Sequence, residues 1–218
     1  MAASNLFGIT SGSTVLSSTL RLRPEGSGPP PKGSEERWNL AESAGRLVEI
    51  SGSGAAASLT FAFGLVLEAQ QQGELVGWVT VTESFFYPPD VAQGGVDLDA
   101  LVVARVPDLR AVSRAGEKLL RSGAFGLVVL DVGAAEIPMP LQARLAGLAR
   151  QHHAALVCLT EKEKRDFSLG SLVSLRVHAE RTQLPQGRFT CKLKVLKDKR
   201  RGPTWSQAEV YRGPAGLC

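Results

Sequence analysis

A short loop of small residues carries the first candidate chemistry in this sequence. The loop runs from Gly52 to Thr60 (GSGAAASLT), between an apolar run that predicts a strand and another that predicts a helix. This is the setting of a P-loop, in which backbone N–H groups bind phosphate, a Lys neutralises phosphate oxygens and a Ser or Thr binds magnesium. In that register Gly52 fits the first glycine, but Ser58 takes the lysine position and Leu59 the hydroxyl position. The sequence therefore predicts a vestigial nucleotide site or a plain strand–helix connection.

Two carboxylates could belong to the same site. Asp131 follows an apolar strand pattern, which is the position of the magnesium-binding aspartate in P-loop enzymes. Glu83 follows another predicted strand and could polarise a water molecule. Ligands of parallel sheets collect at the carboxyl ends of the strands, so the two side chains could lie together. The alternative is that both are solvated loop residues or helix caps.

A basic segment near the C-terminal end is the third candidate. The chain has a net charge of +4, and residues 192–201 (KLKVLKDKRR) hold six basic residues and one acid, so the rest is close to neutral. One basic segment on a near-neutral body predicts a local contact with an anionic partner, DNA or a protein, rather than a generally cationic protein. The six candidate contact residues are Lys192, Lys194, Lys197, Lys199, Arg200 and Arg201.

An aromatic cluster lies next to Glu83. Phe85, Phe86 and Tyr87 follow it directly, and we interpret them as a partner-binding patch, because exposed aromatic clusters usually mark interfaces. Packing in the core and stacking on nucleic-acid bases are the alternatives. Trp78, inside a predicted strand, is expected in the core.

The histidines and cysteines predict no reactive centre. His152 and His153 are adjacent, so they do not converge on one ligand position, and we expect no metal site. No nucleophile with a histidine and an acid is recognisable, and no catalytic residue is assigned. Cys158, Cys191 and Cys218 lack the spacing of a disulfide framework or a zinc site, which predicts free thiols.

The elements that position these residues follow from composition and periodicity. With 44% hydrophobic and 21% charged residues in 218, the chain is expected to form one globular domain, which excludes wholesale disorder and collagen. There is no apolar run of about 18 residues, so no membrane span is expected. Residues 1–40, with the Pro- and Gly-rich stretch 24–36, predict an N-terminal extension and linker, and residues 41–218 the domain.

Apolar strands alternate with helices from residue 45 to residue 159, which predicts an α/β fold with a mainly parallel sheet flanked by helices. After residue 170 the period changes to two, which predicts an antiparallel edge hairpin around the turn LPQGR. The predicted strands are Arg46–Ser51, Val76–Val81, Leu101–Val106, Leu127–Leu130, Ala154–Leu159, Val173–Glu180, Phe189–Val195 and Gln207–Tyr211. The predicted helices are Leu59–Gln71, Leu109–Arg121 and one through Leu141, Leu145 and Leu148.

Four segments, in the right order, resemble the ATPase core of RecA, the bacterial recombinase. They are GRLVEISG with its loop, GVDLDALVV, RSGAFGLVVLDV, and KVLKDKRRGP followed by QAE, and they span residues 45 to about 211. The resemblance implies a RecA-like fold with a degenerate P-loop. It also implies that Glu83 matches the water-activating glutamate and Asp131 the magnesium aspartate. Lys197 and Lys199 match the lysine pair that reaches the ATP of a neighbouring subunit.

Two further positions depart from that family. Thr160 and Glu161 stand where an Asn-Gln pair senses nucleotide, and the stretch 162–171 is far shorter than the family's DNA-binding loop and has balanced charge. A RecA-like core with a lost P-loop lysine is most similar to the ImuA family. That family is linked to damage-induced mutagenesis beside the polymerase-like ImuB.

The resemblance to ImuA implies a non-catalytic accessory protein of SOS-induced translesion synthesis, without a cofactor. Its implied partners are RecA and an ImuB-like homologue of Y-family polymerases, with weak binding to single-stranded DNA and none to membranes. Its implied location is the cytoplasm, at the nucleoid. The alternatives are a divergent P-loop ATPase, a single-stranded DNA-binding module, and a cell-division inhibitor of the SulA type.

Overall fold

A computed structural model describes residues 38–54, 56–82, 91–92 and 94–212. In this part of the chain, eight strands form one sheet in the order β3-β2-β4-β5-β1-β6-β7-β8. The strands are β1 (Leu47–Gly52), β2 (Leu75–Val81), β3 (Leu101–Val106), β4 (Phe125–Gly133), β5 (Ala155–Glu161), β6 (Leu175–Leu184), β7 (Arg188–Asp198) and β8 (Ser206–Arg212). The helices are α1 (Leu40–Ser43), α2 (Ser58–Gln71), α4 (Leu109–Ser122) and α5 (Met139–Gln151).

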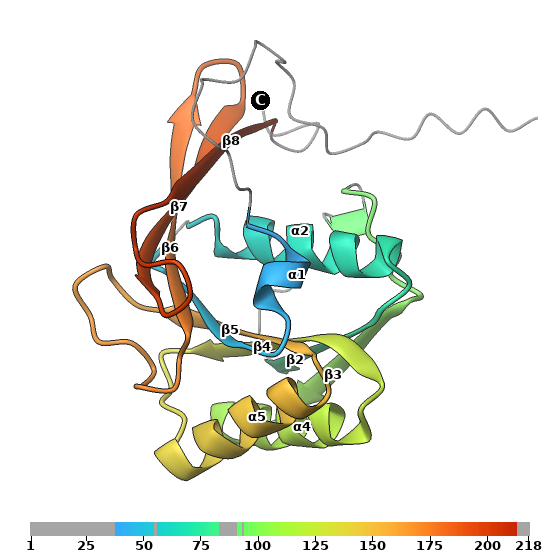
Figure 1. Cartoon of the computed structure of the whole chain (residues 1–218). Helices are drawn as coiled ribbons and strands as arrows, with labels where there is room; N and C mark the ends of the chain where they lie inside the picture. The colour runs from blue at the N-terminus through green and yellow to red at the C-terminus, as the bar shows by residue number, and fades with distance from the viewer. Residues whose placement is uncertain (1–37, 55, 83–90, 93, 213–218) are drawn as a thin grey trace, which may run out of the picture.

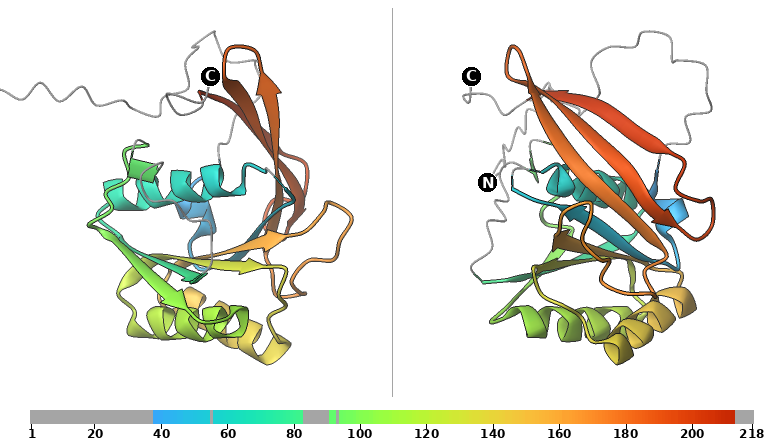
Figure 2. Two further views of the ribbon diagram at one scale, coloured as in Figure 1. Left: turned by 180° about the vertical axis from the view of Figure 1, so that it is seen from behind. Right: turned by 90° about the vertical axis from the view of Figure 1, so that its left-hand side faces the viewer.

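The first six strands in this order run parallel, and β7 and β8 are antiparallel additions at one edge. α2, with α1 beside it, covers one face of the parallel sheet, and α4 and α5 cover the other (Figure 1). The predicted fold class, a mainly parallel sheet flanked by helices with an antiparallel edge hairpin, is confirmed. The antiparallel strands project beyond the end of α2 (Figures 1 and 2).

Each face of the sheet buries its own apolar cluster. Trp78 of β2 is fully buried on the α2 side, where its ring stacks on Phe63 with centroids 4.5 Å apart. Leu145 of α5 and Leu120 of α4 are buried on the other side. Parallel strands covered on both faces must be apolar throughout, which is why their sequences show continuous apolar runs rather than alternation.

Two helices end at the glycines that the sequence marks as helix stops, and α4 has a side-chain cap at its start. α4 begins after Asp108, whose side chain accepts a 2.8 Å hydrogen bond from Ala111 N, and ends at Gly123, with φ of +70°. α2 ends just before Gly73, with φ of +76°. Glycine is favoured at these left-handed positions because it has no Cβ.

The structure extends the predicted elements at several points. Trp38 and Leu40, which lie in the predicted extension, are buried against the core, and α1 was not predicted. β6 continues beyond the predicted end at Glu180 through polar residues to Leu184, and β7 continues beyond the predicted end at Val195 to Asp198. Glu83, Phe85, Phe86, Tyr87, Cys218 and the stretch 24–36 lie outside the described residues.

No helix of the described residues is both long and apolar enough to cross a membrane.

Candidate functional site

The loop after β1 is closely packed and carries no positive charge. A Cβ at Gly52 would lie 2.5 Å from Ser58 Oγ and 2.6 Å from Ala56 Cβ, so the loop folds back tightly on itself. α2 starts at Ser58 without a side-chain hydrogen bond at its N-cap, Ala57. Leu59, at the position of the magnesium-binding hydroxyl, is 45% exposed. The N-terminus of α2 can attract an anion through its N–H groups, but the stretch 52–60 contains no lysine that could neutralise a triphosphate.

Asp131 lies near the carboxyl end of β4, as predicted. Its Oδ2 accepts a 2.9 Å hydrogen bond from Oγ1 of Thr80, a buried residue of β2. β5 separates it from β1, because Asp131 pairs with Leu159 and Gly52 pairs with Glu161. The structure therefore places Asp131 and the loop at the same edge of the sheet, and Glu83 lies outside the described residues.

A buried carboxylate that the sequence analysis did not identify lies in the middle of β1. Glu49 is fully buried, and its carboxylate accepts hydrogen bonds from Ser168 Oγ (2.6 Å), Leu169 N (3.0 Å) and Thr160 Oγ1 (3.2 Å). The Nε of Arg176 lies 3.7 Å from Glu49 Oε1. A buried charge is tolerated only where partners compensate it, so Glu49 fixes the segment after β5 to the sheet. The only signal in the sequence is a Glu inside the apolar run LVEIS.

Ser51 and His178 form a buried serine–histidine contact between β1 and β6. Ser51 Oγ lies 3.2 Å from His178 Nδ1 and donates to Val177 O at 3.1 Å. Burial lowers the pKa of His178. Because Ser51 is fully buried, no substrate can reach its hydroxyl, and the contact joins the two strands.

The basic segment 192–201 divides among different surfaces. Lys192 and Lys194 are exposed on the outer face of β7, opposite Glu180 and His178 of β6. Arg201 is bonded to Glu42 and lies 5.0 Å from the ring centroid of Trp205. Exposed Arg200 lies 3.4 Å from Ala44 O near α1. The six basic residues therefore do not form one continuous face.

Lys197 and Lys199 lie against the segment that follows β5. The Nζ of Lys199 donates to Ser171 O at 2.7 Å, and the Nζ of Lys197 lies 3.4 Å from the carbonyl oxygens of Gly170 and Ser171. Burial lowers the pKa of Lys197, and the neighbouring Lys199 ammonium lowers it further. These are contacts to backbone carbonyls at the surface, so both ammonium groups can exchange them for another acceptor.

The lysine pair and the loop after β1 lie at opposite edges of the sheet. The end of β7, at Asp198, pairs with Leu175 at the start of β6, and Leu175 lies beside Val48 near the start of β1. Gly52 is at the other end of β1. The two candidate sites therefore cannot act on one ligand within a single chain.

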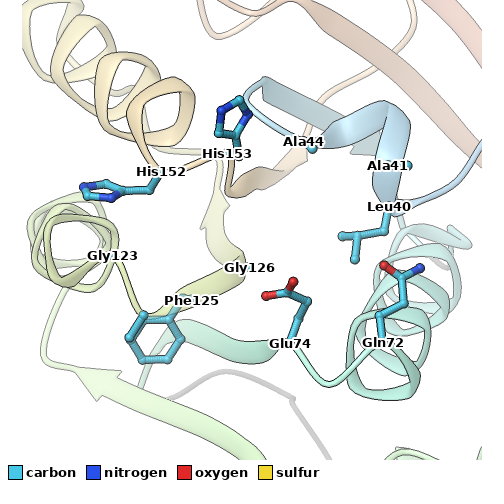
Figure 3. A pocket seen from close by; sticks show the side chains of 11 residues that line it. Leu40, Ala41, Ala44, Gln72, Glu74, Gly123, Phe125, Gly126, His152 and His153 are labelled. Atoms are coloured by element: carbon cyan, nitrogen blue, oxygen red, sulfur yellow. The ribbon is translucent and has the colours of Figure 1, made fainter.

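His152 and His153 line a small pocket at the amino edge of the sheet, about 200 Å³ in volume. The carboxylate of Glu74 points into it, and Leu40 and Phe125 form its apolar walls (Figure 3). Among the residues that the structure describes, no group of three or more His, Cys, Asp or Glu could hold a metal ion.

Comparison with known proteins identifies the family to which this chain belongs. Residues 41–165, more than half of the chain, match the protein family described as the RecA N-terminal domain. The chain belongs to this family. It is 34% identical to Protein RecA of Nocardioides sp. over 113 residues, which cover 51% of this chain and 31% of that protein. It is 31% identical to Protein RecA of Chlorobium chlorochromatii over 140 residues, which cover 56% of this chain and 39% of that protein.

The match to the RecA N-terminal domain contains one candidate site and leaves out the other. The loop after β1 and Asp131 lie within the matched residues 41–165, whereas Lys197 and Lys199 lie beyond them. The chain spans roughly a third of the length of the RecA relatives compared above. Membership therefore accounts for the five parallel strands β1 to β5, for α2 and for the loop between β1 and α2, whereas β6, β7 and β8 lie beyond the match.

Proposed function

We propose that this chain is a non-catalytic RecA-like accessory protein of SOS-induced mutagenesis, of the ImuA type. It acts in translesion DNA synthesis by binding RecA and an ImuB-like homologue of Y-family polymerases. The setting that we propose is the cytoplasm, at the nucleoid. The proposal needs no cofactor, and it rests on a RecA-family fold whose nucleotide loop lacks the groups that catalysis uses.

The loop after β1 is the observation that carries this proposal. Phosphoryl transfer depends on electrostatic stabilisation of the phosphate oxygens by a lysine and a magnesium ion. Ser58 and Leu59 stand at those two positions, and the stretch 52–60 contains no Lys or Arg. Asp131 alone cannot replace them, because its carboxylate repels a triphosphate unless a metal ion lies between the two.

We expect purified protein to show no ATP turnover above background, with or without single-stranded DNA. The measurement is phosphate release at saturating ATP and magnesium, with the Asp131→Ala variant as the matched control. Wild type and variant should give the same rate, because Asp131 has no catalytic role in the proposal. Turnover that Asp131→Ala or Glu83→Gln abolishes would show instead a divergent ATPase.

The exposed lysines of β7 favour weak electrostatic binding to single-stranded DNA as a second activity. Each phosphate contact contributes about −0.7 to the log–log slope of affinity against salt concentration. Replacing Lys192 and Lys194 by Ala should therefore make the slope for an oligo(dT) strand shallower by about 1.4. Fluorescence anisotropy across a salt series measures this.

The control for the DNA measurement is Arg201→Ala. Arg201 is bonded to Glu42, so its loss should leave the slope nearly unchanged. Binding that is insensitive to salt, or equal in wild type and the double lysine variant, would contradict an electrostatic contact through β7.

A further inference from the structure

One aromatic side chain stands almost entirely in water. Phe167 is 92% exposed, whereas the other large hydrophobic residues of the described part are at most 50% exposed, the value of Leu75. Phe167 lies in the loop between β5 and β6, which projects from the side of the sheet (Figure 1). A single exposed apolar residue is ordinary on a protein surface, but the backbone on both sides of Phe167 is fixed by hydrogen bonds.

The backbone after Phe167 is fixed by buried side chains. Ser168 Oγ and Leu169 N donate to the fully buried carboxylate of Glu49 at 2.6 and 3.0 Å. Nε2 of Gln142, a residue of α5 that is 2% exposed, donates to Leu169 O at 2.7 Å. A Cβ at position 170 would lie 2.3 Å from Gln142 Oε1, so a side chain there would have to displace the buried amide that holds Leu169 O.

The backbone before Phe167 is held as well. The guanidinium of Arg176 donates to the carbonyl oxygens of Asp166 and Glu163, and Arg176 is 5% exposed. Glu163 N donates to Asp166 Oδ2 at 2.8 Å, and Lys162 Nζ donates to Phe167 O at 3.1 Å.

Hydrogen bonds before and after Phe167 therefore hold the loop in one conformation in the free protein. Two buried charges, those of Glu49 and Arg176, are committed to holding it, although burying a charge is costly. A loop that is already rigid loses little conformational entropy on binding, which strengthens the contact that it makes. The phenyl ring is the apolar group that this arrangement presents.

The charge around Phe167 favours a protein partner over an anionic polymer. Residues 161–166 carry three acidic and three basic side chains, and Lys164 is bonded to Glu180. Nucleic acid is bound through an excess of positive charge along its backbone, which this loop lacks. Aromatic side chains are enriched at the centres of protein interfaces, with polar groups around them.

The lysine pair at the end of β7 lies against the same segment. Lys197 and Lys199 contact the carbonyls of Gly170 and Ser171, directly after the stretch that Glu49 holds. We propose that Phe167 is the apolar anchor that inserts into an apolar pocket of RecA, with the two lysines beside it in the same interface. This inference rests on the proposed function, in which RecA is a partner.

The test is the affinity of the full chain for RecA assembled on single-stranded DNA with an ATP analogue. Phe167→Ala is expected to weaken binding at least about 10-fold, because truncating an interface anchor has effects of that size. Phe167→Leu keeps an apolar side chain and should retain part of the affinity. Leu75→Ala, which removes a half-exposed apolar residue of β2, is the matched control and should bind as the wild type does. Because Phe167 is exposed, its variants should unfold at the wild-type temperature.

The outcomes separate the inference from the proposed function. If the wild type does not bind RecA, both are refuted. If the wild type binds and Phe167→Ala binds equally well, the anchor is refuted and the proposed function stands. The affinity for oligo(dT) should be the same in wild type and Phe167→Ala. A variant that loses oligo(dT) affinity and keeps RecA affinity would assign the ring to base stacking and overturn the inference.

Discussion

Replacing Arg46 by Ala is expected to lower the free energy of unfolding by about 3–5 kcal/mol. The Nη2 of Arg46 lies 2.7 Å from Asp198 Oδ1, and the two side chains are 3% and 0% exposed. Arg46 also donates to Ser174 Oγ at 2.8 Å and to Ser174 O at 2.9 Å, so it joins the start of β1, the start of β6 and the end of β7. Its removal leaves a buried carboxylate without its main counter-charge. Urea unfolding followed by circular dichroism measures the loss.

The matched control is Arg144→Ala. Its guanidinium lies 3.3 Å from Glu117 Oε1 but is 59% exposed, and exposed pairs contribute only about 0–1 kcal/mol. Equal destabilisation by Arg46→Ala and Arg144→Ala would show that burial does not determine how much an ion pair contributes to the free energy of unfolding.

Lowering the pH should weaken the ion pair between Arg46 and Asp198. Burial alone raises the pKa of Asp198, but hydrogen bonds from Arg200 N, Arg46 and Trp205 outweigh it and hold the pKa below its usual value. A carboxyl whose folded-state pKa is depressed stabilises the fold above its unfolded pKa, which is about 3.9, and this contribution is lost as pH falls through the folded value. Arg46→Ala removes one cause of the depression, so the variant should lose less stability than the wild type on acidification.

The parallel core could be predicted from the sequence because its signals are local. A strand covered on both faces has to be apolar along its whole length, as in Leu127–Leu130, and this requirement acts on neighbouring residues. Gly73 and Gly123 mark helix ends through their own backbone angles. Asp131 could be placed at the carboxyl edge because it directly follows such a strand.

The parts that could not be predicted depend on partners far apart in the chain. Glu49 is compensated by residues 111 to 120 positions away, and the sequence around it shows only an acid in an apolar strand. The segment 192–201 looks like one basic patch because its six basic residues are neighbours in the sequence. In the fold Asp198 is buried against Arg46, 152 positions earlier, and Arg201 is bonded to Glu42. The sequence therefore shows how much charge the segment carries, but not that its side chains face different surfaces and partners.

The arrangement of the two candidate sites predicts a one-sided association with RecA filaments. In RecA-like filaments, as the family resemblance implies, ATP lies between subunits, with the P-loop on one and the lysine pair on the next. This chain has Lys197 and Lys199 at one edge of the sheet, and at the opposite edge a loop without a lysine. We therefore expect it to present its lysines to the ATP of a terminal RecA subunit.

Replacing Lys197 and Lys199 by Ala is expected to weaken that binding by about 2–5 kcal/mol, because truncating one partner of a buried charge pair has an effect of this size. Binding to filaments that hold an ATP analogue should exceed binding to those that hold ADP, since the γ-phosphate supplies the charge. Lys192→Ala/Lys194→Ala removes the same charge from the outer face of β7 and is the control. Equal affinity with ATP analogue, with ADP and with the Lys197/Lys199 variant would refute this docking mode, even if RecA proved to be a partner.

The loss of the P-loop lysine also determines whether a RecA filament can grow beyond the docked chain. A head-to-tail interface propagates only if each added subunit offers both complementary surfaces. Ser58 and Leu59 leave this chain without the surface that would hold ATP for the next RecA subunit, so filament growth should stop at that end. Substoichiometric amounts should therefore shorten RecA filaments, as seen by light scattering and electron microscopy. The Lys197/Lys199 variant should not, because a subunit that cannot dock cannot cap. Shortening by that variant would place the contact elsewhere on the molecule.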